Sequence, residues 1–133
     1  MYNAGALAWL ADGTTVRIRD LGPGAARAVP DDERVAIAAV DLEGQTVGSA
    51  GYARVYGPRA EIVLAVGPDF WHRGLPEVLL SHLRDRAARV GISTLLVRVP
   101  AGDLALIALL REAFCARETV DGAVVHAEFS TSG

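Results

Sequence analysis

The chain has 133 residues and a mass of 14.0 kDa, enough for one hydrophobic core, so we expect residues 1–133 to form a single domain. Hydrophobic residues make up 51% and charged residues 22%, a balance that excludes a disordered chain and indicates a globular one. The formal net charge is −3, which leaves no broad basic surface for phosphate backbones, so we do not expect nucleic acid as a main ligand.

The first half of the sequence is typical of β-strands joined by short turns. The apolar residues 6–10, the Asp12-Gly13 pair and the alternation of Val16 and Ile18 with arginines predict a β-hairpin. Three further strands are predicted over residues 34–40, 46–55 and 61–66. We expect the last of these to lie near the centre of the sheet, because it is short and apolar.

Residues 74–90 change to the period of a helix. Leucine or alanine recurs every four residues from Leu75 to Ala87, and Gly91 is placed to end the helix. A strand over residues 94–99 follows, and then a second helix that Asp103 would cap.

The C-terminal residues 115–129 have the strongest hairpin signal in the chain, with a turn at Asp121-Gly122. The order of strands, helix, strand, helix and hairpin predicts a mixed α/β sheet with helices packed on it.

Several features exclude common kinds of site. The single cysteine, Cys115, excludes an internal disulfide and a cysteine-based zinc site, and we expect it to be a buried, inert thiol. The three histidines are scattered and do not indicate a metal site. The N-terminal residues lack the positive charge of a signal peptide, and no apolar run is long enough for a bilayer, so we expect a cytoplasmic protein without a membrane partner.

Residues 67–74, Gly-Pro-Asp-Phe-Trp-His-Arg-Gly, join the central strand to the long helix. The start of a helix carries free N–H groups and a positive dipole, which suit a phosphate or pyrophosphate, and Arg73 would add a charged contact. Most strand-to-helix turns bind nothing, so this segment by itself leaves both interpretations open.

Motifs along the chain resemble one family. Residues 60–66, followed by Arg73-Gly74-Leu75 at the start of a helix, resemble motif A of the GNAT N-acetyltransferase superfamily. Residues 106–114 resemble its last helix, while residues 12–19 and 121–129 resemble the first strand and closing hairpin of bacterial Pat-type protein acetyltransferase domains. The resemblance implies a mixed, mostly antiparallel α/β sheet with a splayed central strand pair and two main helices.

The resemblance also implies a function, the acetyl-CoA-dependent transfer of an acetyl group to an amine, with a protein lysine as one candidate acceptor. It assigns the acetyl-CoA site to the residues Leu64, Ala65, Val66, His72, Arg73, Gly74 and Leu75. It assigns to Glu61 the role of the base that accepts a proton from the amine. A solvated glutamate at the start of a strand is the alternative interpretation of Glu61, of equal weight.

The chain departs from the family at several of its functional positions. Trp71 and Pro76 replace two residues of the phosphate loop, and Pro76 has no N–H to donate. Asp103 stands where an asparagine usually contacts CoA. Leu110, which we expect in the core, stands at the position of a frequent general-acid tyrosine, and Phe114 at that of a glycine. The departures leave open a degenerate, non-catalytic GNAT-fold module that binds a partner protein, or CoA as a regulatory ligand.

The segment between the first two family strands is short. Residues 21–33 are too few for the two helices that the family places there, and residues 25–29 could form one turn at most. We therefore expect the first two family helices to be largely absent. The acceptor side would then be open, or a second copy in a homodimer or a partner subunit would complete it.

Overall fold

A computed structural model describes residues 6–21 and 33–132 of the chain. Its elements are β1 (Ala6–Trp9), β2 (Thr15–Asp20), β3 (Arg34–Val40), β4 (Thr46–Tyr56), β5 (Arg59–Val66), the 3₁₀ helix η1 (Pro68–Arg73), α1 (Leu75–Arg89), β6 (Thr94–Pro100), α2 (Leu104–Phe114), β7 (Arg117–Asp121) and β8 (Val124–Ser130). The expectation for residues 25–29 falls outside the described residues.

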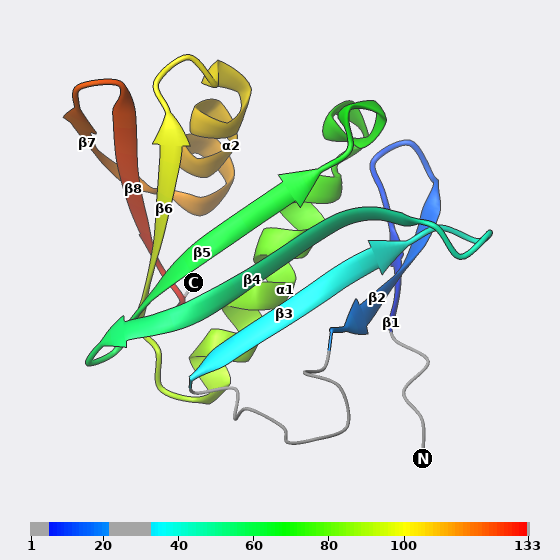
Figure 1. The fold of residues 1–133 in the computed structure, drawn as a ribbon, viewed down its shortest axis with the longest axis horizontal. Coiled ribbons are helices and arrows are strands. Elements are labelled where there is room, and N and C mark those ends of the chain that lie inside the picture. The colour runs from blue at the N-terminus through cyan, green and yellow to red at the C-terminus, as the bar shows by residue number, and fades with distance from the viewer. Residues whose placement is uncertain (1–5, 22–32, 133) are drawn as a thin grey trace.

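All eight strands belong to one sheet in the order β1-β2-β3-β4-β5-β6-β8-β7 (Figure 1). Neighbouring strands run antiparallel except β5 and β6, which are parallel. The parallel pair is possible because α1 connects the two strands by a crossover. The predicted mixed, mostly antiparallel α/β sheet is therefore confirmed, and so is the central position of β5.

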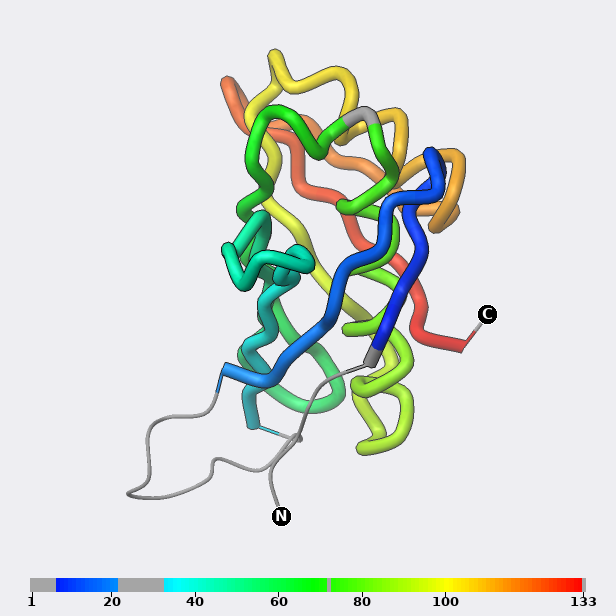
Figure 2. Tube along the Cα trace, turned by 90° about the vertical axis from the view of Figure 1, so that its right-hand side faces the viewer, coloured from blue at the N-terminus to red at the C-terminus, as the bar shows by residue number. Residues whose placement is uncertain are grey.

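The two α-helices pack on the same face of the sheet (Figure 2). The predicted stripe of α1 is confirmed, since Leu75, Leu79, Leu83 and Ala87 are completely buried. In α2 the residues Leu106, Ile107, Leu110 and Phe114 are buried in the same core. Within the described residues no helix covers the opposite face, which we call the open face of the sheet.

Strands β5 and β6 pair along only part of their length. Their register runs from Arg59 opposite Thr94 to Ile62 opposite Val97, and beyond that point they separate. Strand β5 continues towards η1 and β6 towards α2, so a V-shaped gap opens between them (Figure 1). This is the splayed central pair that the family resemblance implied.

The end of α2 differs from the expectation. Cys115 is exposed, so its prediction as a buried thiol is wrong. It has a φ of +55° and ends the helix in the left-handed conformation that glycine favours, although the resemblance assigned the glycine position to Phe114. Phe114 is instead buried, with its ring centroid 5.0 Å from that of Phe129.

Two other expectations near α2 are confirmed. The Asp103 carboxylate caps the helix by accepting a hydrogen bond from the Leu106 N–H at 3.2 Å. Leu110 is completely buried and contributes to the core.

Candidate active site

The gap between β5 and β6 encloses a hollow of about 350 Å³. Its walls are residues 61–64 of β5, Val97, Arg98 and Pro100 of β6, Trp71 of η1, and Asp103 and Leu106 at the start of α2. Trp71 packs against the core at the edge of this hollow, and Tyr52 is buried in the core. Neither side chain fills the gap, so it remains open to a ligand.

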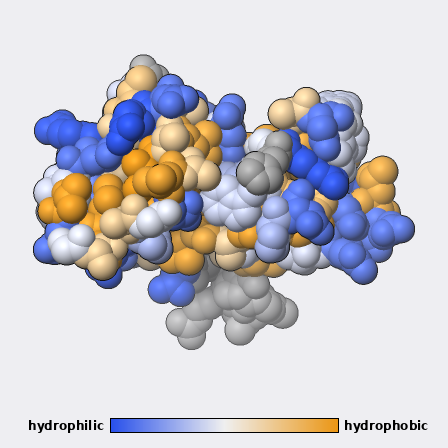
Figure 3. All heavy atoms as spheres, turned by 90° about the horizontal axis from the view of Figure 1, so that it is seen from above, coloured by the Kyte–Doolittle hydropathy of each residue, from blue (hydrophilic) through white to orange (hydrophobic). Residues whose placement is uncertain are grey.

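Apolar surface is exposed on the α2 side of the molecule. Viewed from the end of the molecule where η1 and the start of α2 lie, hydrophobic atoms gather over α2 and the neighbouring hairpin (Figure 3). Leu104 in the first turn of α2 and Val120 of β7 are the large exposed apolar residues there. Neither residue is among those that line the gap itself.

A second hollow, of about 390 Å³, lies on the open face of the sheet. It is lined by Glu61, Leu96, Val97, Arg98, Arg117, Thr119, His126, Ala127 and Glu128. Glu61, Val97 and Arg98 line both this hollow and the gap. The two hollows therefore meet at these three residues.

Glu61 reaches the junction because of its place on β5. Its neighbours Ala60 and Ile62 are buried against the helices, so the alternation of the strand turns Glu61 to the open face. The Glu61 Oε2 lies 3.0 Å from the Arg98 Nε in an ion pair. Glu61 is a predicted site residue, whereas Arg98 was not identified from the sequence.

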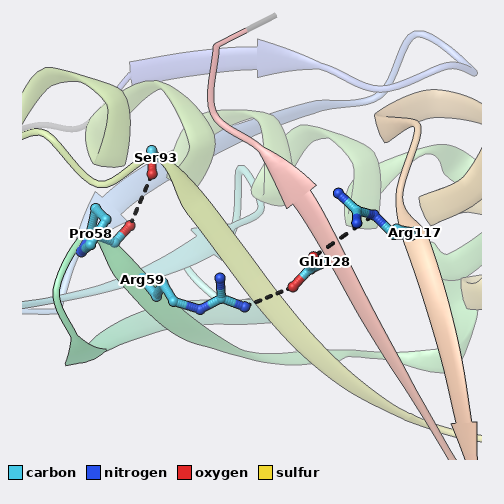
Figure 4. Close-up of polar contacts among 5 residues, drawn as sticks. All are labelled: Pro58, Arg59, Ser93, Arg117 and Glu128. Atoms are coloured by element: carbon cyan, nitrogen blue, oxygen red, sulfur yellow. Dashed lines mark hydrogen bonds and ion pairs between the residues drawn. The ribbon is translucent and has the colours of Figure 1, made fainter.

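A network of polar contacts holds the base of the gap together (Figure 4). The Arg59 guanidinium of β5 donates to the Glu128 carboxylate of β8 at 2.7 Å, and this contact crosses β6. The Arg117 Nε of β7 lies 3.9 Å from the other oxygen of Glu128. The Ser93 hydroxyl of the segment before β6 donates to the Pro58 carbonyl at 3.5 Å, and the Ser93 N–H donates to the same carbonyl at 2.8 Å. These contacts fix the strands from which the gap opens.

The start of α1 is the predicted pyrophosphate site. No side chain caps this helix, so the N–H groups of its first turn have no side-chain acceptor. Gly74 precedes the helix with a φ of +88°, and a Cβ there would lie 3.3 Å from the Ala11 nitrogen, so the backbone conformation and the tight contact both favour glycine. Pro76, the second residue of α1, is completely buried and supplies no N–H.

Arg73 contacts residues outside this helix. Its Nε lies 3.6 Å from the Asp12 Oδ2, and its guanidinium carbon lies 4.7 Å from the centre of the Phe70 ring. The Thr14 N–H donates to Asp12 at 2.9 Å, and hydrogen bonds from Thr14 hold the pKa of the Asp12 carboxyl below its usual value. Arg73 is thus engaged with the β1–β2 turn and would have to turn to reach a phosphate.

The other predicted ligand residues are divided between two places. Leu64 lines the gap, beyond the last residue of β5 that pairs with β6. Ala65 and Val66 line a separate hollow of about 540 Å³ between β4 and η1. His72 and Leu75 lie on either side of Gly74, at the junction of η1 and α1. The structure therefore brings Glu61 and Leu64 to one hollow and Ala65 and Val66 to another, and residues 73–75 are not among those that line the gap.

The open-face residues were missed because they are scattered along the chain. Arg98, Arg117 and Glu128 belong to three strands, and only the register of β6, β8 and β7 brings them together. The alternation of each strand indicates which residues share a face, but it does not indicate which strands are neighbours.

Comparison with known proteins identifies the family. The model of the Acetyltransferase (GNAT) family matches residues 7–114. The chain belongs to the GNAT acetyltransferase family. No curated protein matches this GNAT chain in sequence.

Several solved structures share the GNAT fold of this chain. The GNAT domain of S. lividans PAT is 20% identical with a TM-score of 0.82, over 98% of this chain and 99% of that one. The cAMP-binding acyltransferase from Mycobacterium smegmatis is 18% identical with a TM-score of 0.80, and this chain spans about half of it, 47% of its length. PaiA N-acetyltransferase from Thermoplasma acidophilum, solved in complex with coenzyme A, is 15% identical with a TM-score of 0.66, over 74% of this chain and 61% of that one.

Two further observations limit the kinds of site that this GNAT chain offers. Across residues 6–21 and 33–132, no group of three or more His, Cys, Asp or Glu side chains could hold a metal ion. Neither α1 nor α2, the α-helices of that part of the chain, is long and apolar enough to cross a membrane.

Proposed function

We propose that the chain is an N-acetyltransferase that transfers the acetyl group of acetyl-CoA to an amine. The observation that carries this proposal is the meeting of two hollows at Glu61, one in the gap between β5 and β6 and one on the open face. A transferase needs such an arrangement, because donor and acceptor must reach one reacting position from different sides.

The gap is the proposed site for acetyl-CoA, which supplies the acetyl group as a thioester. Since β6 does not pair with β5 beyond Ile62, the backbone of Leu64, Ala65 and Val66 is available to an extended ligand on that side. The amides from His72 to Leu75, at the uncapped start of α1, are the proposed pyrophosphate contacts. Pro76, the next residue, has no N–H to add to this set.

Glu61 is the proposed general base. An amine arrives as an ammonium ion and must lose a proton before its nitrogen can attack, and a carboxylate at the junction of the hollows can accept that proton directly or through water. Arg98 holds Glu61 at 3.0 Å, so the acceptor has to compete with this guanidinium for the carboxylate. Leu110 is buried and cannot act as an acid, so the thiolate would take its proton from water.

Binding of acetyl-CoA tests the first part of this proposal. Calorimetric titration should give saturable binding, and Gly74→Val should weaken it, because the added side chain would disturb the turn before α1. Gly91→Val is a matched control at another positive-φ glycine, beyond the far end of α1. Absence of heat and of a thermal shift at millimolar acetyl-CoA would rule out the enzyme.

Turnover tests the second part. The wild-type chain should release CoA in the presence of acetyl-CoA and an amine, assayed with lysine peptides, polyamines and amino acids. Saturable binding of acetyl-CoA without turnover of any amine would contradict catalysis.

A non-catalytic GNAT module is the second candidate function. Two observations favour it: Arg98 occupies the Glu61 carboxylate, and Pro76 removes a donor from the pyrophosphate site. Such a module would bind CoA, or a partner protein on the open face, without turnover. The same titration and assay separate it from the enzyme.

A further inference from the structure

The hollow on the open face has an unusual order of charges with depth. Its two carboxylates belong to Glu61 and Glu128, whose side chains are 33% and 30% exposed. Its two guanidiniums belong to Arg98 and Arg117, whose side chains are 67% and 84% exposed. Glu128 is already paired at 2.7 Å with Arg59, whose side chain is 30% exposed, so a ligand that enters from solvent meets positive charge at the rim and the Glu61 carboxylate further in.

This order is unfavourable for an acceptor that carries only positive charge. An ammonium ion would pass two guanidiniums before it reached Glu61, and it would displace Arg98 without offering that guanidinium a new partner. A polyamine or a lysine in a basic sequence would meet this repulsion at full strength.

For an acceptor with both an amine and a carboxylate, the same order of charges is favourable. Its carboxylate can accept hydrogen bonds from the Arg98 guanidinium, whose Nε now lies 3.0 Å from Glu61, and Arg117 lies at the same rim. Its ammonium group can then take the place of Arg98 beside Glu61. The ion pair between Arg98 and Glu61 is lost, and two form in its place, from Arg98 to the carboxylate of the acceptor and from Glu61 to its ammonium group. No charge of this site is left unpaired.

We propose that the open-face hollow selects amines that carry a nearby carboxylate, and that Arg98 is the residue that recognises this carboxylate. The inference depends on the proposed function, because it names the acceptor of the same site. A free amino acid has this chemistry, and so does a lysine side chain next to an acidic residue in a protein.

Matched pairs of acceptors test this inference. The first pair is 6-aminohexanoate and 6-aminohexanamide. The amide lacks the negative charge of the carboxylate, while the amine at the other end of the molecule keeps its basicity. The second is a peptide that contains Lys-Glu and the same peptide with Lys-Gln. For the wild type, we expect kcat/KM to be higher by about tenfold or more for the acid of a pair. The pair with the larger ratio identifies the source, a free amino acid or a protein.

Substitutions of arginine test whether the preference for the acid depends on Arg98. Arg98→Gln should lower kcat/KM for the acid and bring the ratio within a pair close to one, whereas Arg98→Lys should retain part of the preference. Arg89→Gln is the matched control, because Arg89 is exposed in the last turn of α1, and it should leave the ratio unchanged. Equal kcat/KM for acid and amide in the wild type, or a ratio that survives Arg98→Gln, would overturn the inference.

Direct binding keeps the inference separate from catalysis. The proposed function fails only if no amine of the turnover assay is acetylated; if neither member of any pair is acetylated, titration of 6-aminohexanoate followed by NMR decides the inference. Binding of the acid but not the amide, lost in Arg98→Gln, would support the inference without the enzyme. Equal binding of acid and amide, or no binding of either, would overturn it.

Discussion

Glu61 of β5 and Arg98 of β6 form an ion pair across the point where these two strands separate. The last pair in register is Ile62 opposite Val97, so Glu61 precedes the point of separation and Arg98 follows it. Both residues line the gap and the open-face hollow, and the Glu61 Oε2 lies 3.0 Å from the Arg98 Nε. Any reaction that joins ligands from the two hollows has to take place next to this contact.

Substitution of Glu61 is the first test of this position. Glu61→Gln keeps the size of the side chain but cannot accept a proton, so we expect kcat to fall by about 10²–10⁴-fold, the usual contribution of a general base. The affinity for acetyl-CoA should not change, as measured by calorimetry. Glu43→Gln, in the exposed β3–β4 turn, is the control and should retain full activity. Equal rates for Glu61→Gln and the wild type would remove Glu61 as the base.

Substitution of Pro76 should increase the affinity for acetyl-CoA. Pro76→Ala restores an N–H in the first turn of α1, and one hydrogen bond to a charged phosphate would tighten acetyl-CoA by roughly 10- to 100-fold. The side chain is completely buried, so the variant should also lose about 1–2 kcal/mol of unfolding free energy with the lost methylenes.

Calorimetry and chemical denaturation measure the two effects of Pro76→Ala separately. Pro58→Ala, in an exposed turn at the opposite end of β5, is the control for affinity and should bind acetyl-CoA like the wild type. An unchanged affinity in Pro76→Ala would mean that the start of α1 does not bind the pyrophosphate.

Much of the fold could be predicted because local patterns agree with the tertiary structure. The stripe from Leu75 to Ala87 has the period of one helix face, and that face is the one that the sheet buries. The Asp103 cap follows from the residue type and its place before an apolar run.

The candidate site could be predicted only in part, because it depends on strand pairing. Motif A drew attention to Glu61, but nothing near Glu61 in the sequence indicates Arg98. Their proximity follows from the parallel register of β5 and β6, which a crossover through α1 establishes. The length of that crossover does not specify the register, so the ion pair and the open-face hollow could be found only from the structure.

His82 of α1 provides a test of stability against pH. Burial lowers the pKa of its imidazole from 6.5, and the Arg86 guanidinium adds to this effect. The unfolded chain therefore binds a proton at a higher pH than the folded chain does. This contribution to stability is complete above pH 6.5 and is lost as the pH falls through the lower folded-state pKa.

The expected result is a difference between the wild type and His82→Gln that depends on pH. As the pH falls below about 6.5, the wild type should lose more unfolding free energy than the variant, whereas well above that pH the two should change in parallel. Denaturant titrations at a series of pH values measure this difference, and an NMR titration of the His82 ring reports the folded-state pKa directly. A folded-state pKa above 6.5 would contradict the prediction.

Cys115 adopts a left-handed backbone conformation that its residue type does not indicate in the sequence. Most L-residues are disfavoured at its φ of +55°, by about 1–2 kcal/mol, and glycine avoids this cost but loses more freedom on folding. Cys115→Gly should therefore raise the unfolding free energy by up to about 1 kcal/mol, as measured by chemical denaturation. Cys115→Ala, which keeps the Cβ and its strain, is the control and should not be stabilised. Equal stability of the two variants would show that the left-handed turn after α2 carries no strain. The exposure of Cys115 has a separate test: a thiol reagent should modify the native wild-type chain, and failure to modify it would contradict the exposed position.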